Sequence, residues 1–160
     1  MKPLVVVAFL AVTVLPLTTD AQTVSERDAV LTVVQAFFDT MTAKDVDRAR
    51  EILVPQGRFH AANLRGDGRP DRSFAVEEYL ADLQASKQVM RERIWNPEIR
   101  IHGRIATMWA PYDFWIDGKL SHCGVDAFDL VKTEKGWKIA GGTYTLESKC
   151  EPSPLGPLKP

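Results

Sequence analysis

The sequence has only two cysteines, three histidines and almost no net charge, and each shortage argues against a class of function. Lys and Arg number 20 against 21 Asp and Glu, giving a formal net charge of -1. Without a basic field to collect phosphates, we predict no nucleic-acid partner. The sequence also lacks a glycine-rich phosphate loop and the Gly-x-Ser-x-Gly, Cys-x-x-Cys and His-Glu-x-x-His motifs. Hydrolases and redox enzymes of those types therefore have no support.

Metal ligands are equally sparse. A metal site needs three or four converging ligands at recognisable spacing. The candidates His60, His122, Asp113 and Asp126 show no such spacing. We therefore predict neither a metal nor another cofactor.

The one long hydrophobic run lies at the N-terminus. Lys2 precedes an apolar stretch from Leu4 to Leu17, and a small residue, Ala21, ends the segment. This pattern predicts a signal peptide, residues 1–21, and a periplasmic or secreted protein without membrane contact after its removal. A permanent anchor is the alternative, although the run is shorter than the roughly 20 residues that cross a bilayer and contains Pro16.

Both cysteines, Cys123 and Cys150, lie in the mature part of the chain. Disulfides persist outside the cytoplasm, so we expect these two residues to pair. The alternative is two unrelated thiols, one in a strand and one on the tail.

Hydrophobic periodicity predicts three helices at the N-terminal end of the mature chain. Ser25 and Asp28 resemble a capping box for the first helix, and Asp45 and Ser73 are candidate caps for the second and third. The second helix should end at Pro55 and Gly57, before a strand from 58 to 64. The apolar positions are Val30, Val33, Val34, Phe37, Phe38 and Met41 in the first helix, Val46, Ala49, Ile52 and Leu53 in the second, and Val76, Tyr79, Leu80 and Leu83 in the third.

From Val89 onward the pattern alternates, which predicts an antiparallel strand meander. Turns are expected at Asp117-Gly118 and between 133 and 136. We predict one domain, residues 22–150, because a chain of 160 residues with 45% hydrophobic and 26% charged residues suits a single soluble core. Residues 151–160 are rich in proline and should form an extended tail.

The Asp117-Gly118 turn predicts which residues face each other across a hairpin. Counting outward sets Asp113 opposite His122 and Trp109 opposite Asp126. Trp115 and Phe128 join this face, which we expect to be concave because Ile139 should oppose Leu130. The opposite face, with Met108, Ala110, Tyr112, Phe114, Cys123, Val125 and Ala127, is also apolar and predicts a homodimer through the convex sheet. A β-bulge between 117 and 126 would shift this pairing.

The concave face predicts a site for a small hydrophobic or aromatic ligand. His122 is the candidate general base or acid, Asp113 orients it, and Asp126 polarises the substrate. Trp109, Trp115, His60 and Phe128 are candidate ligand contacts. Structural alternatives are a cross-strand ion pair for Asp113 and His122, a hydrogen-bonded Asp126, core packing for the tryptophans and a surface position for His60.

This order of elements, ending in Gly136-Trp137-Lys138-Ile139, resembles the nuclear transport factor 2-like superfamily with its SnoaL-like and lumazine-binding-like branches. The segments Tyr112-Asp113-Phe114, Asp117-Gly118-Lys119, 121–126 and 152–157 resemble those of exported bacterial members. The resemblance implies an α+β cone with three helices packed on a strongly curved antiparallel sheet. Enzymes of the superfamily use Tyr, Asp and His groups inside the cone, and Asp113, His122, Asp126, His60 and Tyr79 are the candidates here.

Three hypotheses follow for function. The first is an exported small-molecule-binding domain, and the second is a cofactor-independent isomerase, dehydratase or cyclase using acid–base chemistry. The third is a protein-interaction module whose cone is filled by its own side chains. The identity of the ligand stays open at this point.

Overall fold

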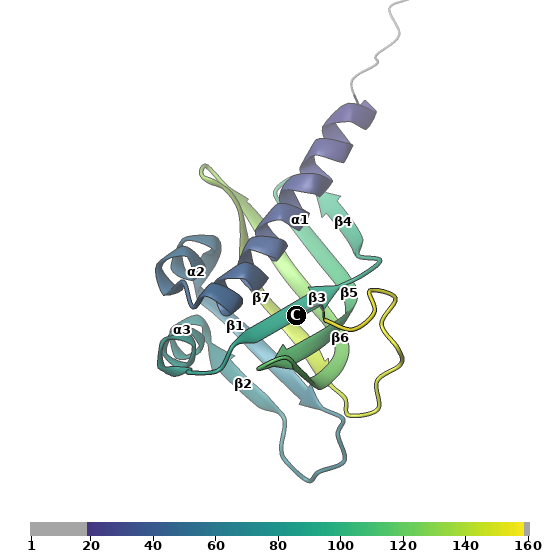
Figure 1. Ribbon diagram of the computed structural model, residues 1–160. Coiled ribbons are helices and arrows are strands. Elements are labelled where there is room, and N and C mark those ends of the chain that lie inside the picture. Colours follow the sequence, from purple (N-terminus) through teal and green to yellow (C-terminus); the bar gives the residue numbers. More distant parts are fainter. Residues whose placement is uncertain (1–18, 159–160) are drawn as a thin grey trace, which may run out of the picture.

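The computed structural model describes residues 19–158, which form three helices and a seven-stranded sheet (Figure 1). In chain order the elements are α1 (Thr19–Ala43), α2 (Val46–Ile52), β1 (Leu53–Asn63), β2 (Arg72–Ala75), α3 (Val76–Ala85), β3 (Met90–Ile94), β4 (Glu98–His102), β5 (Ile105–Ile116), β6 (Lys119–Thr133) and β7 (Gly136–Leu146). Residues 1–18, most of the predicted signal peptide, lie outside the described residues. Among the described helices, none is both long and apolar enough to cross a membrane.

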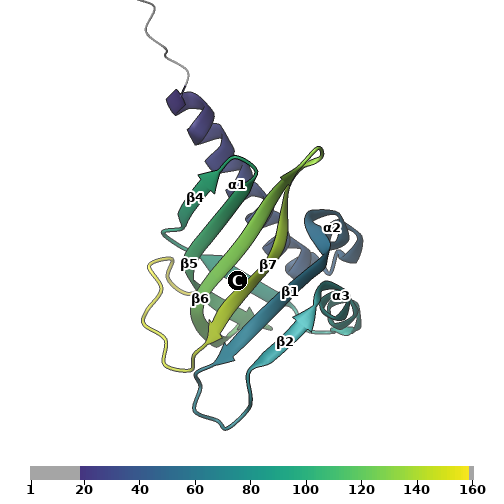
Figure 2. The ribbon, with the colours of Figure 1, turned by 180° about the vertical axis from the view of Figure 1, so that it is seen from behind.

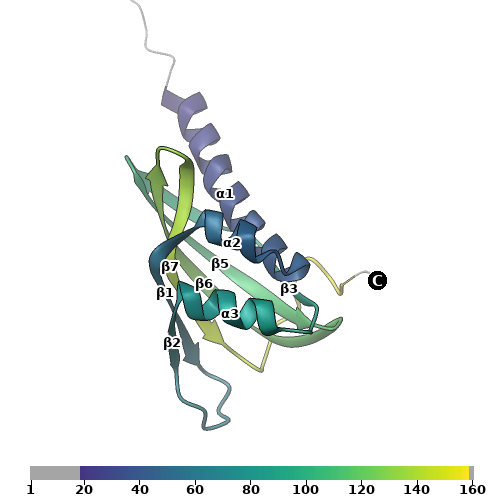
Figure 3. The ribbon, with the colours of Figure 1, turned by 90° about the vertical axis from the view of Figure 1, so that its left-hand side faces the viewer.

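The sheet has the order β2-β1-β7-β6-β5-β3, and β4 pairs with the other part of β5. Strands β5, β6 and β7 form the predicted antiparallel meander, whereas β1 pairs parallel to β7. Figure 3 shows the curved sheet in profile, with the helices on its inner side, and Figure 2 shows the outer face without a helix over it. The predicted α+β cone is confirmed, with a mixed sheet in place of a wholly antiparallel one.

Helix α1 covers the inner face of the sheet with one apolar stripe, as its periodicity predicts. Its buried hydrophobic residues are Val30, Val34, Phe37, Phe38 and Met41. The predicted capping box at Ser25 is wrong, because the helix begins at Thr19. No proline or glycine interrupts the residues between them, so nothing local ends the helix there.

The shorter helices follow the sequence pattern less closely. The side chain of Asp45 caps α2, accepting a hydrogen bond from the backbone N–H of Arg48 at 2.9 Å, as predicted. Pro55 and Gly57 do not end this helix, because both lie inside β1. Ser73 does not cap α3, because it lies in the short edge strand β2, which was not predicted. Pairing with neighbouring strands therefore overrides these local signals.

Three aromatic rings join the helical layer to the sheet. The ring centroids of Phe37 on α1 and Phe59 on β1 lie 5.7 Å apart in a stacked arrangement. Phe128 on β6 meets both rings edge-on, at 5.7 Å from Phe37 and 6.4 Å from Phe59. This cluster holds the two layers apart and borders the space between them.

Candidate functional site

A cavity of about 420 Å³ lies between the helices and the concave face of the sheet. Its apolar wall includes Phe37, Met41, Phe59, Leu83, Phe114 and Phe128. Its polar groups include Glu92, His122, Asp126 and the three tyrosines of the chain, Tyr79, Tyr112 and Tyr144. An apolar hollow of this size with a few convergent polar groups suits a small molecule.

Three predicted site residues line this cavity: His122, Asp126 and Phe128. All three lie on β6 and alternate along it, so their side chains share one face of the sheet. The sequence therefore predicts the inner face of β6 correctly. Their chemical roles stay predictions.

The predicted pairing of β5 with β6 is wrong beyond the first two residue pairs. Trp115 faces Leu120 as expected, but the next pair is Phe114 with His122, which leaves Ser121 bulged out of the ladder. A bulge of one residue shifts every later pair by one. Because side chains alternate along a strand, the shift also turns the opposite face of β5 toward the helices.

The bulge exchanges the two faces of β5. Met108, Ala110 and Tyr112 are at most 1% exposed and point inward, although they were assigned to the convex dimer face. Trp109 is 55% exposed and points outward. The predicted ligand-stacking position of Trp109 is therefore wrong, and the predicted dimer face loses its most apolar residues.

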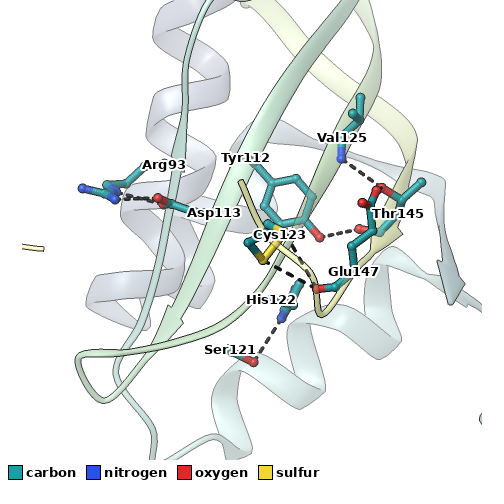
Figure 4. Close-up of a disulfide and its surroundings, with 10 residues drawn as sticks. Arg93, Tyr112, Asp113, Ser121, His122, Cys123, Val125, Thr145 and Glu147 are labelled. Atoms are coloured by element: carbon teal, nitrogen blue, oxygen red, sulfur yellow. Dashed lines mark hydrogen bonds and ion pairs between the residues drawn. A yellow bond between two sulfur atoms is a disulfide. The ribbon is translucent and has the colours of Figure 1, made fainter. Parts of the chain in front are cut away.

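Asp113 lies on the outer side of the sheet and binds Arg93 of β3. The Arg93 guanidinium donates two hydrogen bonds to the Asp113 carboxylate, at 2.8 and 2.5 Å. It also donates to the backbone oxygen of Gly156 at 2.8 Å and lies 5.4 Å from the Trp115 ring centre. Figure 4 shows Asp113 directed at Arg93 and away from His122. Asp113 therefore fixes Arg93, which holds the C-terminal tail, and does not orient the histidine. Trp115 belongs to this outer cluster.

His60 also lies away from the cavity. It is exposed on β1, between the buried residues Phe59 and Ala61, which point to the other face. The predicted ligand contact of His60 is therefore wrong, and its surface alternative holds.

The most unusual feature of the cavity is a pair of carboxyl groups, Glu92 from β3 and Asp126 from β6, which are hydrogen-bonded to each other. Burial raises the pKa of Asp126 to about 7, against the opposing effect of its hydrogen bond with Glu92. Burial, followed by the nearby charge of Asp126, raises the pKa of Glu92 well above its usual value. Both shifts favour a protonated form of the pair over two carboxylates.

One oxygen of this pair lacks an ordinary donor. The Oδ2 atom of Asp126 is buried, and no N–H or hydroxyl group among the described residues donates to it. An ionised carboxylate only accepts hydrogen bonds, and a protonated Glu92 or a bound molecule can supply the donor. Glu92 was not predicted, although Met90, Glu92 and Ile94 alternate with two arginines and so place a glutamate on an apolar face.

His122 sits in an aromatic environment. Its ring stacks on Phe114 with centroids 4.7 Å apart, and its Nδ1 atom lies 3.1 Å from the Ser121 hydroxyl. Burial, with a smaller contribution from the positive charge of Arg65, lowers the pKa of His122 to about 4. The imidazole is neutral at neutral pH, so the predicted imidazolium paired with Asp113 is wrong.

Residues 25–145, from α1 to β7, match the family model described as "Putative lumazine-binding". This chain belongs to that family. Among curated proteins, no sequence matches this member.

Solved structures show that the lumazine-binding-like chain has the nuclear transport factor 2-like fold. A nuclear transport factor 2-like protein from Cytophaga hutchinsonii has a TM-score of 0.64 at 16% identity and covers 75% of this chain and 97% of its own. A protein of unknown function from Mycobacterium tuberculosis has a TM-score of 0.65 at 14% identity, with 86% and 78% covered. A "putative dehydratase" from Streptomyces avermitilis has a TM-score of 0.62 at 16% identity, with 78% and 97% covered.

The lumazine-binding-like domain carries a disulfide beside its cavity, between Cys123 of β6 and Cys150, as predicted. The bond fixes the segment after β7 against β6, where Tyr112 donates a hydrogen bond of 2.6 Å to the backbone oxygen of Thr145 (Figure 4). The Cys123 backbone also exchanges hydrogen bonds with Glu147. The bridge therefore stabilises the end of β7, which carries part of the cavity wall.

Proposed function

We propose that this domain binds a small, largely apolar molecule inside its cone, with a donor group of that molecule hydrogen-bonded to Asp126. The observation that carries the proposal is the hollow of about 420 Å³, walled by aromatic rings around one carboxyl pair. A core built for stability alone avoids such a void, because a void loses packing contacts. A cone filled by its own side chains therefore has little support.

The chemistry of the wall describes the ligand. Phe37, Phe59 and Phe128 favour a flat ring system, while Asp126 favours an N–H or O–H group at one end of it. The family description makes lumazine, a flat heterocycle with N–H groups, a natural first compound to test. Phenols and aromatic ketones extend the test to simpler shapes.

Thermal stabilisation of the full chain tests this proposal. A compound at about 100 times its Kd should raise the free energy of unfolding by about 2.7 kcal/mol. Ser86→Trp, at the end of α3 where Ser86 lines the cavity, should fill the hollow and abolish the effect. Trp109→Ala, on the outer face, should leave it unchanged. The proposal is wrong if no compound stabilises the wild type, or if Ser86→Trp retains the stabilisation.

A second candidate is an acid–base enzyme, and the carboxyl pair favours it. A general base works best when its pKa lies near the working pH, as that of Asp126 does at about 7. Glu92, whose pKa burial raises well above its usual value, is the matching acid. In this role Asp126 would take a proton from a carbon next to a carbonyl group, and Glu92 would donate its proton to the carbonyl oxygen.

Hydrogen–deuterium exchange separates the enzyme from the binder. An aromatic ketone that binds the protein in heavy water should lose its acidic C–H signal by NMR if Asp126 removes that proton. Asp126→Asn should then stop the exchange and retain binding of the ketone. Binding without exchange in the wild type would leave the domain as a binder.

We also propose export to the periplasm or the medium. The support is the N-terminal sequence pattern together with the disulfide, since such bonds persist outside the cytoplasm. Fractionation of cells that produce the full chain should place a protein shortened at Ala21 outside the cytoplasm. Full-length protein in the cytoplasmic fraction would contradict export.

The proposal of a homodimer through the convex sheet now rests on different residues. Ile105 and Trp109 lie four positions apart on the outer face of β5 and are 60% and 55% exposed. Trp109→Glu should convert a dimer to a monomer in sedimentation experiments. Leu120→Glu, at an exposed residue beside the far turn, is the control. A wild-type monomer would contradict the proposal.

A further inference from the structure

Arg65 is a charged residue of the cavity wall that the proposed function does not use. It follows β1 in the loop to β2, is half-buried and lines the cavity. Its backbone is held firmly, because Leu64 N–H donates to the Leu146 oxygen at 2.9 Å and Arg65 N–H donates to the Asn63 side chain at 3.3 Å. The loop therefore presents this arginine at a fixed place on the cavity wall.

The neighbouring arginines have partners, but the guanidinium of Arg65 has none among the described residues. Arg69 binds Asp67, Arg72 binds Glu78 and Asp82, and Arg58 donates to Ser73. Of the two carboxylates in this loop, Asp67 binds Arg69 and Asp71 accepts a hydrogen bond from the Asn63 backbone N–H, and neither binds Arg65. A half-buried guanidinium without an acceptor is unusual, since buried charges are ordinarily paired.

The charge of Arg65 acts on the polar groups of the cavity. It contributes to the lowered pKa of His122 and opposes the raised pKa values of Tyr112 and Tyr144. The Glu92–Asp126 pair supplies the opposite charge from β3 and β6. The cavity therefore has a cationic group on its loop side and a proton-sharing carboxyl pair on the sheet.

We propose that the ligand is a small aromatic carboxylate, whose anionic group binds Arg65 while a donor at its other end binds Asp126. This inference rests on the proposed function and names the class of its ligand. A guanidinium matches a carboxylate with two parallel hydrogen bonds. A phosphate dianion fits less well, because Arg65 is the only unpaired cation among the described residues that line the cavity, and the carboxyl pair opposes a second negative charge.

The test uses two matched series of compounds. The charged series is 4-hydroxyphenyl-acetate, -propanoate and -butanoate, and the neutral series is the corresponding carboxamides. Isothermal titration of the full chain at neutral pH should find one chain length at which the carboxylate binds about tenfold or more tightly than its carboxamide. Arg65→Gln should remove this preference while the carboxamide binds within about twofold of its wild-type affinity.

Arg100→Gln is the matched control, because it removes the same charge from exposed β4, away from this cavity. It should retain the preference for carboxylates. If carboxylates bind no better than carboxamides, or if Arg65→Gln keeps the preference, the inference is overturned while binding of the carboxamides still supports the proposed function. If neither series binds, the inference is overturned, and the proposed function is then decided by the thermal stabilisation test with lumazine.

Discussion

Glu92 on β3 and Asp126 on β6 meet as two hydrogen-bonded carboxyl groups inside an otherwise largely apolar cavity. Nothing in the packing of the cone requires them, since an apolar residue on either strand would avoid the loss of hydration that raises both pKa values. Such a pair lowers stability at neutral pH, because its charge is buried. Paired carboxyl groups with raised pKa values in a cavity are typical of functional sites.

Asp126→Asn should change how stability depends on pH. The pKa of Asp126 is raised from 3.8 to about 7 in the folded protein, so the folded state binds more protons between these values. The contribution of this carboxyl group to the free energy of unfolding therefore falls as pH rises through that window, by at most about 1.4 kcal/mol per pH unit. Urea unfolding should show Asp126→Asn gaining stability relative to wild type from about pH 4 to about pH 7.

The control for this prediction is Asp129→Asn, an exposed carboxylate on the same strand. Its stability difference from wild type should stay nearly constant over the same window. A constant difference for Asp126→Asn would show that its pKa is not raised.

His122→Gln should change the pH dependence of stability in the opposite direction to Asp126→Asn. The pKa of His122 is lowered from 6.5 to about 4, so the unfolded state binds more protons between these values. The contribution of this histidine is therefore lost as pH falls through that window. Relative to wild type, His122→Gln should gain stability as pH falls, whereas His102→Gln, exposed on β4, should not. If the free energy of unfolding of His122→Gln followed that of wild type with a constant difference over this pH window, the lowered pKa of His122 would be contradicted.

The cone itself could be predicted from the sequence because its signals are local. The stripe from Val30 to Met41 fixes α1, and the Asp117-Gly118 turn forms with positive φ at both residues, 50° and 76°. The pairing of Leu130 with Ile139 is also as predicted. These features depend on neighbours within a few residues or across one tight turn.

The site could be predicted only in part, because it depends on one long-range irregularity. The bulge at Ser121 has no glycine or proline to mark it. Its single extra residue keeps His122 and Asp126 in the cone but sends Asp113 and Trp109 to the outer face. Glu92 was missed for a different reason: it lies between two arginines, which by composition resemble an exposed edge strand.

Substitutions of Arg93 and Asp113, which form an ion pair, should have strongly non-additive effects on stability. Their side chains are only 17% and 5% exposed, so Arg93→Met leaves an uncompensated carboxylate and should cost about 3–5 kcal/mol. Arg93→Met combined with Asp113→Leu should recover most of that loss, since neither charge is then buried alone. Arg91→Met, exposed on the same strand, should change stability by less than about 0.5 kcal/mol. Additive costs in the double variant would contradict the pairing.

The Cys123–Cys150 disulfide should contribute more to stability than the tail that follows it. The bond joins residues separated by 27 positions, and closing a loop of this size stabilises the folded state by about 3–4 kcal/mol in the chain-entropy model. Removing residues 151–160 deletes the hydrogen bond from Arg93 to Gly156, which is worth about 1.5–3 kcal/mol because its donor is charged. Urea unfolding of Cys123→Ser with Cys150→Ser, compared with the truncated chain, should therefore show the larger loss for the cysteine variant. Reduction of the wild type should reproduce that loss and leave the cysteine variant unchanged, whereas equal stability of the reduced and oxidised wild type would contradict a stabilising bond.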